Sequence, residues 1–188
     1  VNSRILTDII RKTKKNSIVK CKLEDSRLII NSDNSVFELN ALSADEFPKF
    51  VPLDPTNAFE LTIPQIKRLF NKTKFAISAE ETRYYLNGIY LHVTEAHDRN
   101  FLTGVATDSH RLSSSSIEVE KVENFSSLIL PRKTVYQLCS LLTETNEKLT
   151  MQSSDNKIKF SLGNTKLISK VIDGKFPDYK KVVPTNNQ

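Results

Sequence analysis

The chain carries, near its C-terminus, the segment Ser169-Lys170-Val171-Ile172-Asp173-Gly174-Lys175-Phe176-Pro177-Asp178-Tyr179, and a similar segment stands 129 residues earlier, Asn40-Ala41-Leu42-Ser43-Ala44-Asp45-Glu46-Phe47-Pro48-Lys49-Phe50. Offsets of 129 and 69 residues also superpose apolar positions of three predicted helices: Leu6, Ile66 and Val135 at one position, Ile9, Leu69 and Leu138 at the next. A sequence that repeats itself repeats a structural unit. We therefore expect three copies of one unit, over roughly 1–50, 57–120 and 121–188.

Each copy begins with a short amphipathic helix and continues with strand-like alternation. The first helix is predicted over Arg4 to Lys14, the second begins after Thr62, and the third follows Pro131. Thr62 is expected to cap the second helix while Gln65 reaches back to it. Turn-forming pairs then divide the alternating stretches into hairpins: Glu24-Asp25, Asp33-Asn34, Asp155-Asn156 and Gly163-Asn164. The pattern predicts an α+β fold of repeated helix plus antiparallel β-meander units, with the helices on one face of the sheets.

The composition narrows the class of protein. The 188 residues include 38% hydrophobic and 26% charged residues, with a formal net charge of +5. No run of eighteen apolar residues is present, which argues against a membrane span, and the opening Val1-Asn2-Ser3-Arg4 gives no support to secretion. Two cysteines, Cys21 and Cys139, cannot form a disulfide framework or a four-ligand zinc site, and both are expected in the core. We expect a cytoplasmic protein.

Basic side chains lie on the polar faces of the predicted helices. They are Arg11, Lys14, Arg68, Lys72 and Lys133. Repetition of the unit aligns these faces, and lysine and arginine neutralise phosphates without reading bases. The pattern favours sequence-independent binding of a polyanion. An adaptor that binds only proteins is the alternative, and it would require an apolar or mixed helix face.

Four ordered segments resemble the bacterial DNA polymerase III beta subunit family, the sliding clamps. They are Arg83-Tyr84-Tyr85-Leu86-Asn87-Gly88, Gly104-Val105-Ala106-Thr107-Asp108-Ser109-His110-Arg111-Leu112, Pro131-Arg132-Lys133 and Asp173 to Tyr179. The resemblance covers essentially the whole chain. It implies that residues 1–50 are the second half of the family's first domain, 51–56 a linker and 57–184 a complete second domain. Residues 185–188 would begin a linker to a third domain that this chain lacks.

The resemblance implies a head-to-tail homodimeric ring around double-stranded DNA, without catalysis, cofactor or metal. Such a ring tethers the replicative polymerase, the clamp loader and other proteins that carry a clamp-binding motif, and it has no membrane contact. The implied DNA contacts are Arg83, Tyr84 and Tyr85. The implied cleft for partner peptides is lined by Leu86, Thr107, Ser109, His110, Arg111, Leu112 and Pro184. The implied edge toward a neighbouring subunit is Ile9, Phe37 and Leu39. The family commonly has glycine where this chain has Ser109; if the turn needs a positive φ, a serine there costs about 1 kcal/mol.

Two enzyme-like patterns have simpler explanations. Asp108-Ser109-His110 suggests a hydrolase triad, but neighbours on an extended strand point to opposite faces and cannot form the relay. His92, His97 and Asp98 suggest a metal site, but they fall between two strand-like runs, and we expect a hydrated loop there.

Overall fold

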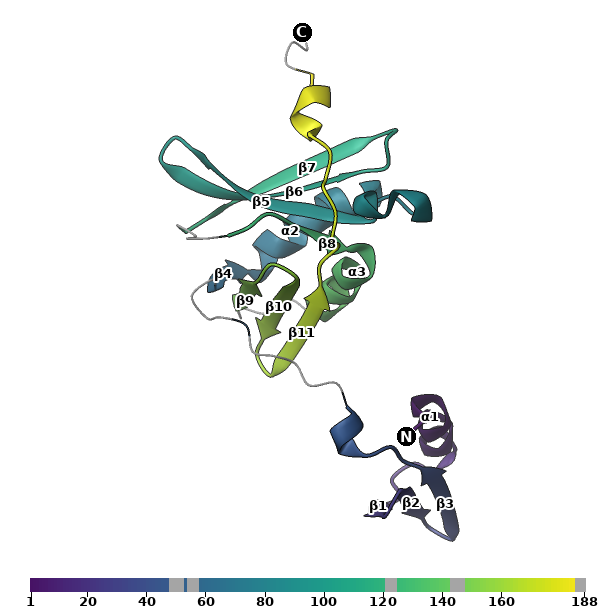
Figure 1. The fold of residues 1–188 in the computed structure, drawn as a ribbon. Coiled ribbons are helices and arrows are strands. Elements are labelled where there is room, and N and C mark those ends of the chain that lie inside the picture. The colour runs from purple at the N-terminus through teal and green to yellow at the C-terminus, as the bar shows by residue number, and fades with distance from the viewer. Residues whose placement is uncertain (48–52, 54–57, 121–124, 143–147, 185–188) are drawn as a thin grey trace. The chain divides into compact units, whose positions relative to one another are not determined.

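The computed structural model describes residues 1–47, 53, 58–120, 125–142 and 148–184 (Figure 1). The chain forms two compact units, Val1–Val51 and Pro52–Gln188, here called the N-terminal and C-terminal units. The helices are α1 (Ser3–Lys12), α2 (Ile63–Thr73) and α3 (Arg132–Leu141), with 3₁₀ turns η1 (Ala44–Glu46), η3 (Lys74–Ala76), η4 (Glu81–Leu86) and η5 (Tyr179–Val182). The strands are β1 (Val19–Glu24), β2 (Arg27–Ser32), β3 (Ser35–Asn40), β4 (Ala58–Thr62), β5 (Gly88–Ala96), β6 (Arg99–Thr107), β7 (Leu112–Val119), β8 (Leu128–Pro131), β9 (Lys148–Ser153), β10 (Lys157–Leu162) and β11 (Thr165–Lys170).

The N-terminal unit is one helix and a three-stranded antiparallel sheet in the order β1-β2-β3. The Asn2 side chain caps α1 by accepting from the amides of Arg4 and Ile5 at 3.0 and 3.2 Å. The helix ends at Lys12, earlier than predicted, because Thr13 takes an extended backbone conformation. Ile9 and Ile30 are the buried apolar side chains among the described residues of this unit. Both predicted hairpin turns are present in this sheet.

The C-terminal unit contains two four-stranded antiparallel sheets, β7-β6-β5-β8 and β11-β10-β9-β4 (Figure 1). Helix α2 follows strand β4 in the chain, and helix α3 follows strand β8. The element order repeats as strand, helix and three-stranded meander, which confirms the repeat of helix plus meander. Each leading strand pairs with the meander of the other repeat: β4 pairs with β9 and β8 pairs with β5. The sequence reading missed this exchange, because strands of five and four residues are too short for a clear alternation.

The start of α2 agrees with its prediction. The Thr62 hydroxyl accepts from the Gln65 amide, and the Gln65 side chain accepts from the Thr62 amide at 2.9 Å. The buried face of α2 lies on the β5–β6 sheet, where Gly104 leaves room for Leu69: a Cβ built on Gly104 would lie 3.3 Å from Leu69 Cγ. This packing belongs to the main apolar core of the unit.

The two cysteines differ from their expected burial. Cys21 lies exposed on β1, so the prediction of a core position is wrong for it. The residues of β1 after Val19 are all exposed. Cys139 is half-buried on α3 and packs against the core.

Candidate functional site

The tyrosine segment, defined here as residues 80–86, forms the turn η4 directly before β5. Its backbone is kinked at Arg83, where φ is −109° and ψ is 53°. Tyr84 is 53% exposed, Tyr85 is half-buried and Leu86 is buried. The two tyrosine rings meet edge to face with centroids 5.8 Å apart. The segment therefore exposes the Tyr84 ring to solvent and holds Tyr85 partly buried.

Gly174 forms the support on which these tyrosines pack. A Cβ built on Gly174 would lie 3.1 Å from Tyr85 Cβ and 3.2 Å from Tyr84 Cε2, closer than an ordinary contact. The segment 83–88 and the segment 173–179, which are distant in sequence, are thus in contact through Tyr84, Tyr85 and Gly174. Glycine is favoured at this position by the close approach and not by its backbone angles.

The cleft turn, defined here as residues 107–112, connects β6 to β7. The Asp108 carboxylate accepts from the amides of His110 and Arg111 at 3.1 and 3.0 Å and pairs with Arg111 Nε at 2.9 Å. The hydrogen bond from the Arg111 amide is the main reason why the pKa of Asp108 lies below its usual value. The Thr107 hydroxyl donates to the Arg111 carbonyl at 2.7 Å and accepts from the Ser109 amide at 3.1 Å. Ser109 has a φ of 76°, so the backbone of this turn does adopt a positive φ at the position where the family commonly has glycine.

This geometry leaves no acyl-transfer triad at Asp108-Ser109-His110. The three residues lie in a turn, so the expectation that they lie on an extended strand is wrong. The Asp108 carboxylate is engaged by the backbone and by Arg111, and its partners include the His110 amide rather than the imidazole.

The predicted cleft residues are brought together only in part. Leu86 belongs to a small buried cluster with Val105, Ile129 and Phe176, and Leu112 packs against the same cluster. Ser109, His110 and Arg111 are exposed on the turn above it. Pro184 is exposed after η5 and is not a member of this cluster. The apolar base and the polar edge of the cleft are therefore adjacent, whereas Pro184 lies at the end of a separate segment.

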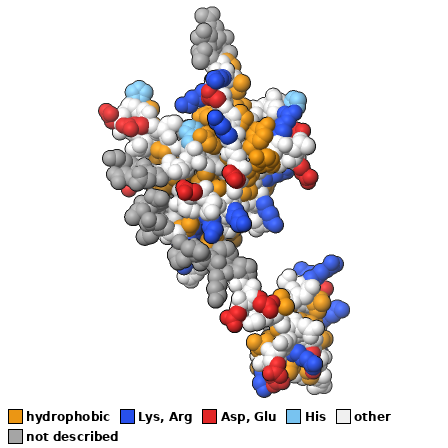
Figure 2. All heavy atoms as spheres, in the orientation of Figure 1, with side chains coloured by type: hydrophobic (Ala, Val, Ile, Leu, Met, Phe, Trp, Pro, Cys, Tyr) orange, Lys and Arg blue, Asp and Glu red, His pale blue; other side chains and the backbone are white. Residues whose placement is uncertain are grey.

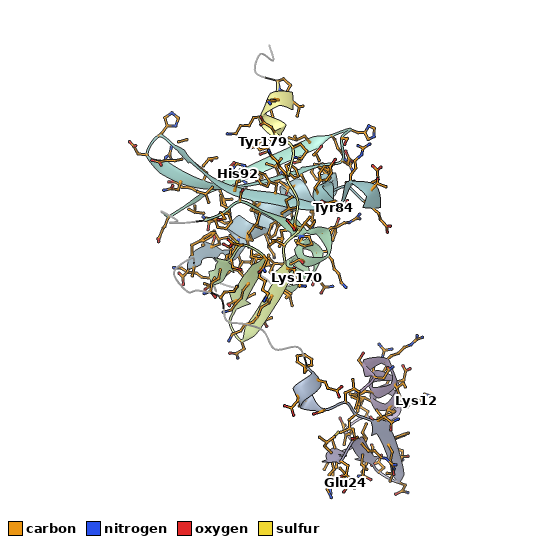
Figure 3. All side chains as sticks on the ribbon, viewed as in Figure 1. Lys12, Glu24, Tyr84, His92, Lys170 and Tyr179 are labelled. Carbon is orange, nitrogen blue, oxygen red and sulfur yellow. The ribbon has the colours of Figure 1, made fainter. Side chains whose placement is uncertain are left out.

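That separate segment, residues 171–184, is here called the C-terminal strap. Ile172 donates its amide to the Ile129 carbonyl at 2.9 Å, and the Phe176 ring stacks on Tyr90 with centroids 5.0 Å apart and an angle of 5°. Farther along, the Tyr179 hydroxyl lies 3.0 Å from His92 Nε2 (Figure 3). These contacts hold the strap on the β5 side of the sheet.

The sequence-based prediction for His92 is wrong. It was expected in a hydrated loop, but it is buried on β5, and burial lowers its pKa, with nearby Lys180 adding to the effect. Burial likewise raises the pKa of Tyr179. His97 and Asp98 do form the exposed β5–β6 turn, with φ of 51° and 59°. Among the described residues, no three potential metal ligands converge. The flanking Leu91 and Val93 were the available signal that His92 continues a strand.

The helices of the C-terminal unit carry the predicted basic residues on exposed positions: Arg68 and Lys72 on α2 and Lys133 on α3. Further cations missed by the prediction lie where the helices approach each other. Lys74 and Arg132 both stand over the Tyr136 ring, at 5.8 and 5.7 Å from its centroid. Lys67 and Lys74 are also close enough to Cys139 to oppose the rise that burial causes in its pKa.

Basic side chains are not confined to helices. Arg11 lies exposed in the last turn of α1, but Lys14 lies beyond its end, so the helical placement of Lys14 is wrong. Lys166 and Lys170 are exposed on β11. Figure 2 shows lysine and arginine on both units, mixed with hydrophobic and acidic side chains. The helix faces are therefore basic without being the exclusive location of positive charge.

The three residues predicted at a subunit edge lie within the N-terminal unit. Ile9 is buried, while Phe37 and Leu39 on β3 are half-buried. In the sheet, Phe37 is opposite Ile30 and Leu39 is opposite Leu28.

No helix in the described residues has the length and apolar character to cross a bilayer.

Comparison with known proteins agrees with this geometry. Residues 60–178 match the family description "DNA polymerase III beta subunit, central domain", and residues 1–51 match the N-terminal domain of the same subunit. The chain belongs to the beta sliding clamp family. Members of this family are non-catalytic processivity factors of DNA replication.

Several relatives make the same point. The beta sliding clamp of Caulobacter vibrioides is 38% identical over 185 residues, which cover 97% of this chain and 50% of the relative. The clamp of Rickettsia felis is 36% identical over 192 residues, covering 100% of this chain and 49% of the relative. The chain thus spans about half the length of these relatives.

Solved structures show the same fold. The sliding clamp of Bartonella birtlesii bound to griselimycin superposes with a TM-score of 0.92 at 39% identity, covering 100% of this chain and 51% of that one. The Caulobacter crescentus polymerase III beta subunit superposes with a TM-score of 0.87 at 37% identity, covering 99% and 51%. The predicted α+β clamp fold is confirmed.

Proposed function

We propose that this chain is part of a sliding-clamp subunit that encircles duplex DNA and tethers the replicative polymerase and other partners to it. The observation that carries the proposal is the close association of the tyrosine segment, the cleft turn and the Gly174 support on a clamp fold. The ring is a head-to-tail homodimer whose neighbouring-subunit edge includes Ile9, Phe37 and Leu39. It acts in the bacterial cytoplasm and needs no cofactor.

The proposed domain assignment follows the internal repeat. Residues 1–50, which fall in the match to the N-terminal domain, correspond to the second of two repeats, because 40–50 align with 169–179 at the end of the second repeat of the C-terminal unit. Residues 57–184 are proposed to form a complete central domain, while the linkers predicted over 51–56 and 185–188 lie outside the described residues apart from residue 53.

DNA binding is proposed at exposed cations and at one aromatic ring. The contributing residues are Arg11, Lys14, Arg68, Lys72, Lys133, Arg83, Tyr84 and Tyr85. Because the contacts are to phosphates, binding is independent of sequence and weakens as salt rises. Fluorescence anisotropy of the 188-residue chain with a duplex of about 20 bp, between about 50 and 200 mM salt, tests this. Replacing Arg68 and Lys72 together by Gln is expected to flatten the salt dependence, whereas Glu46→Gln, an exposed acid, does not.

The alternative, a protein-only adaptor, makes the opposite prediction for the same titration. It requires that neither the chain nor the full-length protein binds duplex DNA. The exposed cations of α2 and α3 favour the clamp.

Partner peptides are proposed to bind where the cleft turn meets the buried cluster. Leu86 and Leu112 provide apolar contacts, and Thr107, Ser109, His110 and Arg111 orient the peptide backbone. Pro184, exposed at the end of the strap, contacts the part of the peptide that extends beyond the buried cluster. Leu112→Asp is expected to abolish binding of a peptide with apolar anchors in a calorimetric titration. Val36→Asp, at a position on β3 that is 64% exposed, is the matched control and keeps wild-type affinity.

A further inference from the structure

The Arg83 side chain joins the tyrosine segment to the cleft turn by a hydrogen bond. Its Nη1 donates to the Ser109 hydroxyl at 2.7 Å, and its Nε pairs with a Glu80 carboxylate oxygen at 3.3 Å. Glu80 is held in turn by the Thr82 hydroxyl, which donates to it at 2.8 Å. On the other side, the Ser109 amide donates to Thr107. Arg83 is therefore the point at which two hydrogen-bonded turns meet.

Ser109 occupies a backbone conformation that a serine adopts at a cost. Its φ of 76° lies in the left-handed region, where glycine has no side chain to clash. A strained residue is retained only where its surroundings hold it in place, and such residues cluster at functional sites. Here the hydroxyl is the group that a glycine would lack, and it accepts a charge-assisted hydrogen bond, which is stronger than a bond between neutral groups.

The same arginine is accessible to a ligand. The Arg83 side chain is 45% exposed, and it adjoins Tyr84, the exposed ring of the segment. A phosphate bound by arginine accepts a pair of N–H groups from the guanidinium. In the structure, Ser109 and Glu80 already accept from Nη1 and Nε. The guanidinium keeps three further N–H groups, so the competition concerns the position of the side chain: a phosphate that draws Arg83 away from the cleft turn breaks its hydrogen bond to Ser109.

We propose that Ser109 is a positioning residue that holds Arg83 on the cleft turn and gives it up when a DNA phosphate reaches the tyrosine segment. The inference rests on the proposed function, since it takes duplex DNA as the ligand of that segment. Releasing Arg83 removes a hydrogen bond that steadies the cleft turn. DNA contact and the shape of the cleft are thereby coupled, and any such coupling is reciprocal.

The first test measures DNA affinity without the hydroxyl. Ser109→Ala and Ser109→Gly remove the competitor of the phosphate, and Ser114→Ala, an exposed serine on β7, is the matched control. Both Ser109 variants are expected to bind a duplex of about 20 bp severalfold more tightly than wild type. The slope of log affinity against log salt should stay at the wild-type value, because Arg83 contacts the phosphate in the bound state of wild type and of both variants. Agreement between the two variants assigns the effect to the hydroxyl and not to relief of backbone strain.

A second variant verifies that Arg83 is the group released. Arg83→Gln should lower the salt slope by about 0.9 in both the wild-type and the Ser109→Ala background, and it should abolish the gain in affinity that Ser109→Ala gives. If both Ser109 variants bind DNA with the affinity of wild type, or more weakly, the inference is overturned while the proposed function stands.

Arginine side-chain NMR gives a readout that needs no DNA. The Arg83 Nε–Hε and Nη signals should show slower hydrogen exchange and hindered guanidinium rotation in wild type and in Ser114→Ala than in the two Ser109 variants. Identical Arg83 signals in all four proteins would refute the hydrogen bond and with it the inference. If none of the proteins binds the duplex, the proposed function has failed and the coupling falls with it, whatever the Arg83 signals show.

Discussion

At the scale of single residues, the sequence and the structure agree on which residues matter and differ on how they are connected. The segments 83–88, 104–112 and 173–179 were identified from their residue pattern, and the structure brings all three into one region of the C-terminal unit. The bond between Arg83 and Ser109 and the packing of Gly174 under the tyrosines were not predicted. Neither follows from periodicity, because each joins residues from loops that are distant in sequence.

Gly174 supports a prediction of its own. In Gly174→Ala the new methyl lies 3.1 Å from Tyr85 Cβ and 3.2 Å from Tyr84 Cε2, so the tyrosines must move. Overpacking in a close-packed core costs about 1–3 kcal/mol, and because Gly174 and Tyr84 are exposed the cost here should not exceed the low end of that range. We expect lower stability in urea denaturation and weaker DNA binding in anisotropy. In a Tyr84→Ala background the added cost should be smaller, because one of the two clashes is gone; an equal cost in both backgrounds would mean that the methyl is accommodated without moving Tyr84.

At the scale of helices and strands, the features that could be predicted are those determined by residues close together in sequence. The capping residues Thr62 and Gln65 predicted the start of α2, and turn-forming pairs predicted the hairpins. The short strands β4 and β8 and the course of the strap were missed, since each is defined by a partner far away in sequence: β9, β5 and the ring of Tyr90. His92 was misplaced although its neighbours Leu91 and Val93 indicate a strand; what could not be predicted was its partner Tyr179 on the strap.

The strap should respond to pH through His92. Burial and Lys180 lower the pKa of His92 in the folded chain, so the unfolded chain takes up a proton at a higher pH than the folded one. This contribution to stability is present above the ordinary histidine pKa near 6.5 and is lost as the pH falls from there toward the lowered folded value. Thermal denaturation should show a steeper loss of Tm from pH 7 to 5 in wild type than in His92→Gln. His110→Gln, at an exposed histidine, should retain the wild-type dependence.

At the scale of the whole molecule, the two units differ in how much apolar surface they bury. The C-terminal unit has an extended core that includes both sheets and both helices. In the N-terminal unit the exposed apolar side chains outnumber the buried ones: Ile5, Ile10, Ile18, Leu23, Val36, Leu42 and Phe47 are exposed in it. Phe47 is 70% exposed, whereas its repeat counterpart Phe176 is 7% exposed and stacks on Tyr90. The repeat was predictable from the sequence, but this difference in burial was not.

The difference predicts unequal local stability within the 188-residue chain. Regions with few buried apolar contacts open at low free energy. Amides of β1–β3 are therefore expected to exchange with deuterium faster than those of β5, β6, β9 and β10, as measured by hydrogen-exchange mass spectrometry. Equal protection of the two units would contradict the prediction and would indicate that the exposed apolar side chains are covered in solution.

The exchange of leading strands in the C-terminal unit has a consequence for how that unit can be divided. Since β4 completes the sheet of the second repeat and β8 that of the first, neither half has a finished sheet when it is alone. A polypeptide cut between the repeats would yield two pieces that each need the other to cover an edge. When the two pieces are co-expressed, they should reassemble without a covalent connection. The unit could therefore be divided at this point to make a split reporter.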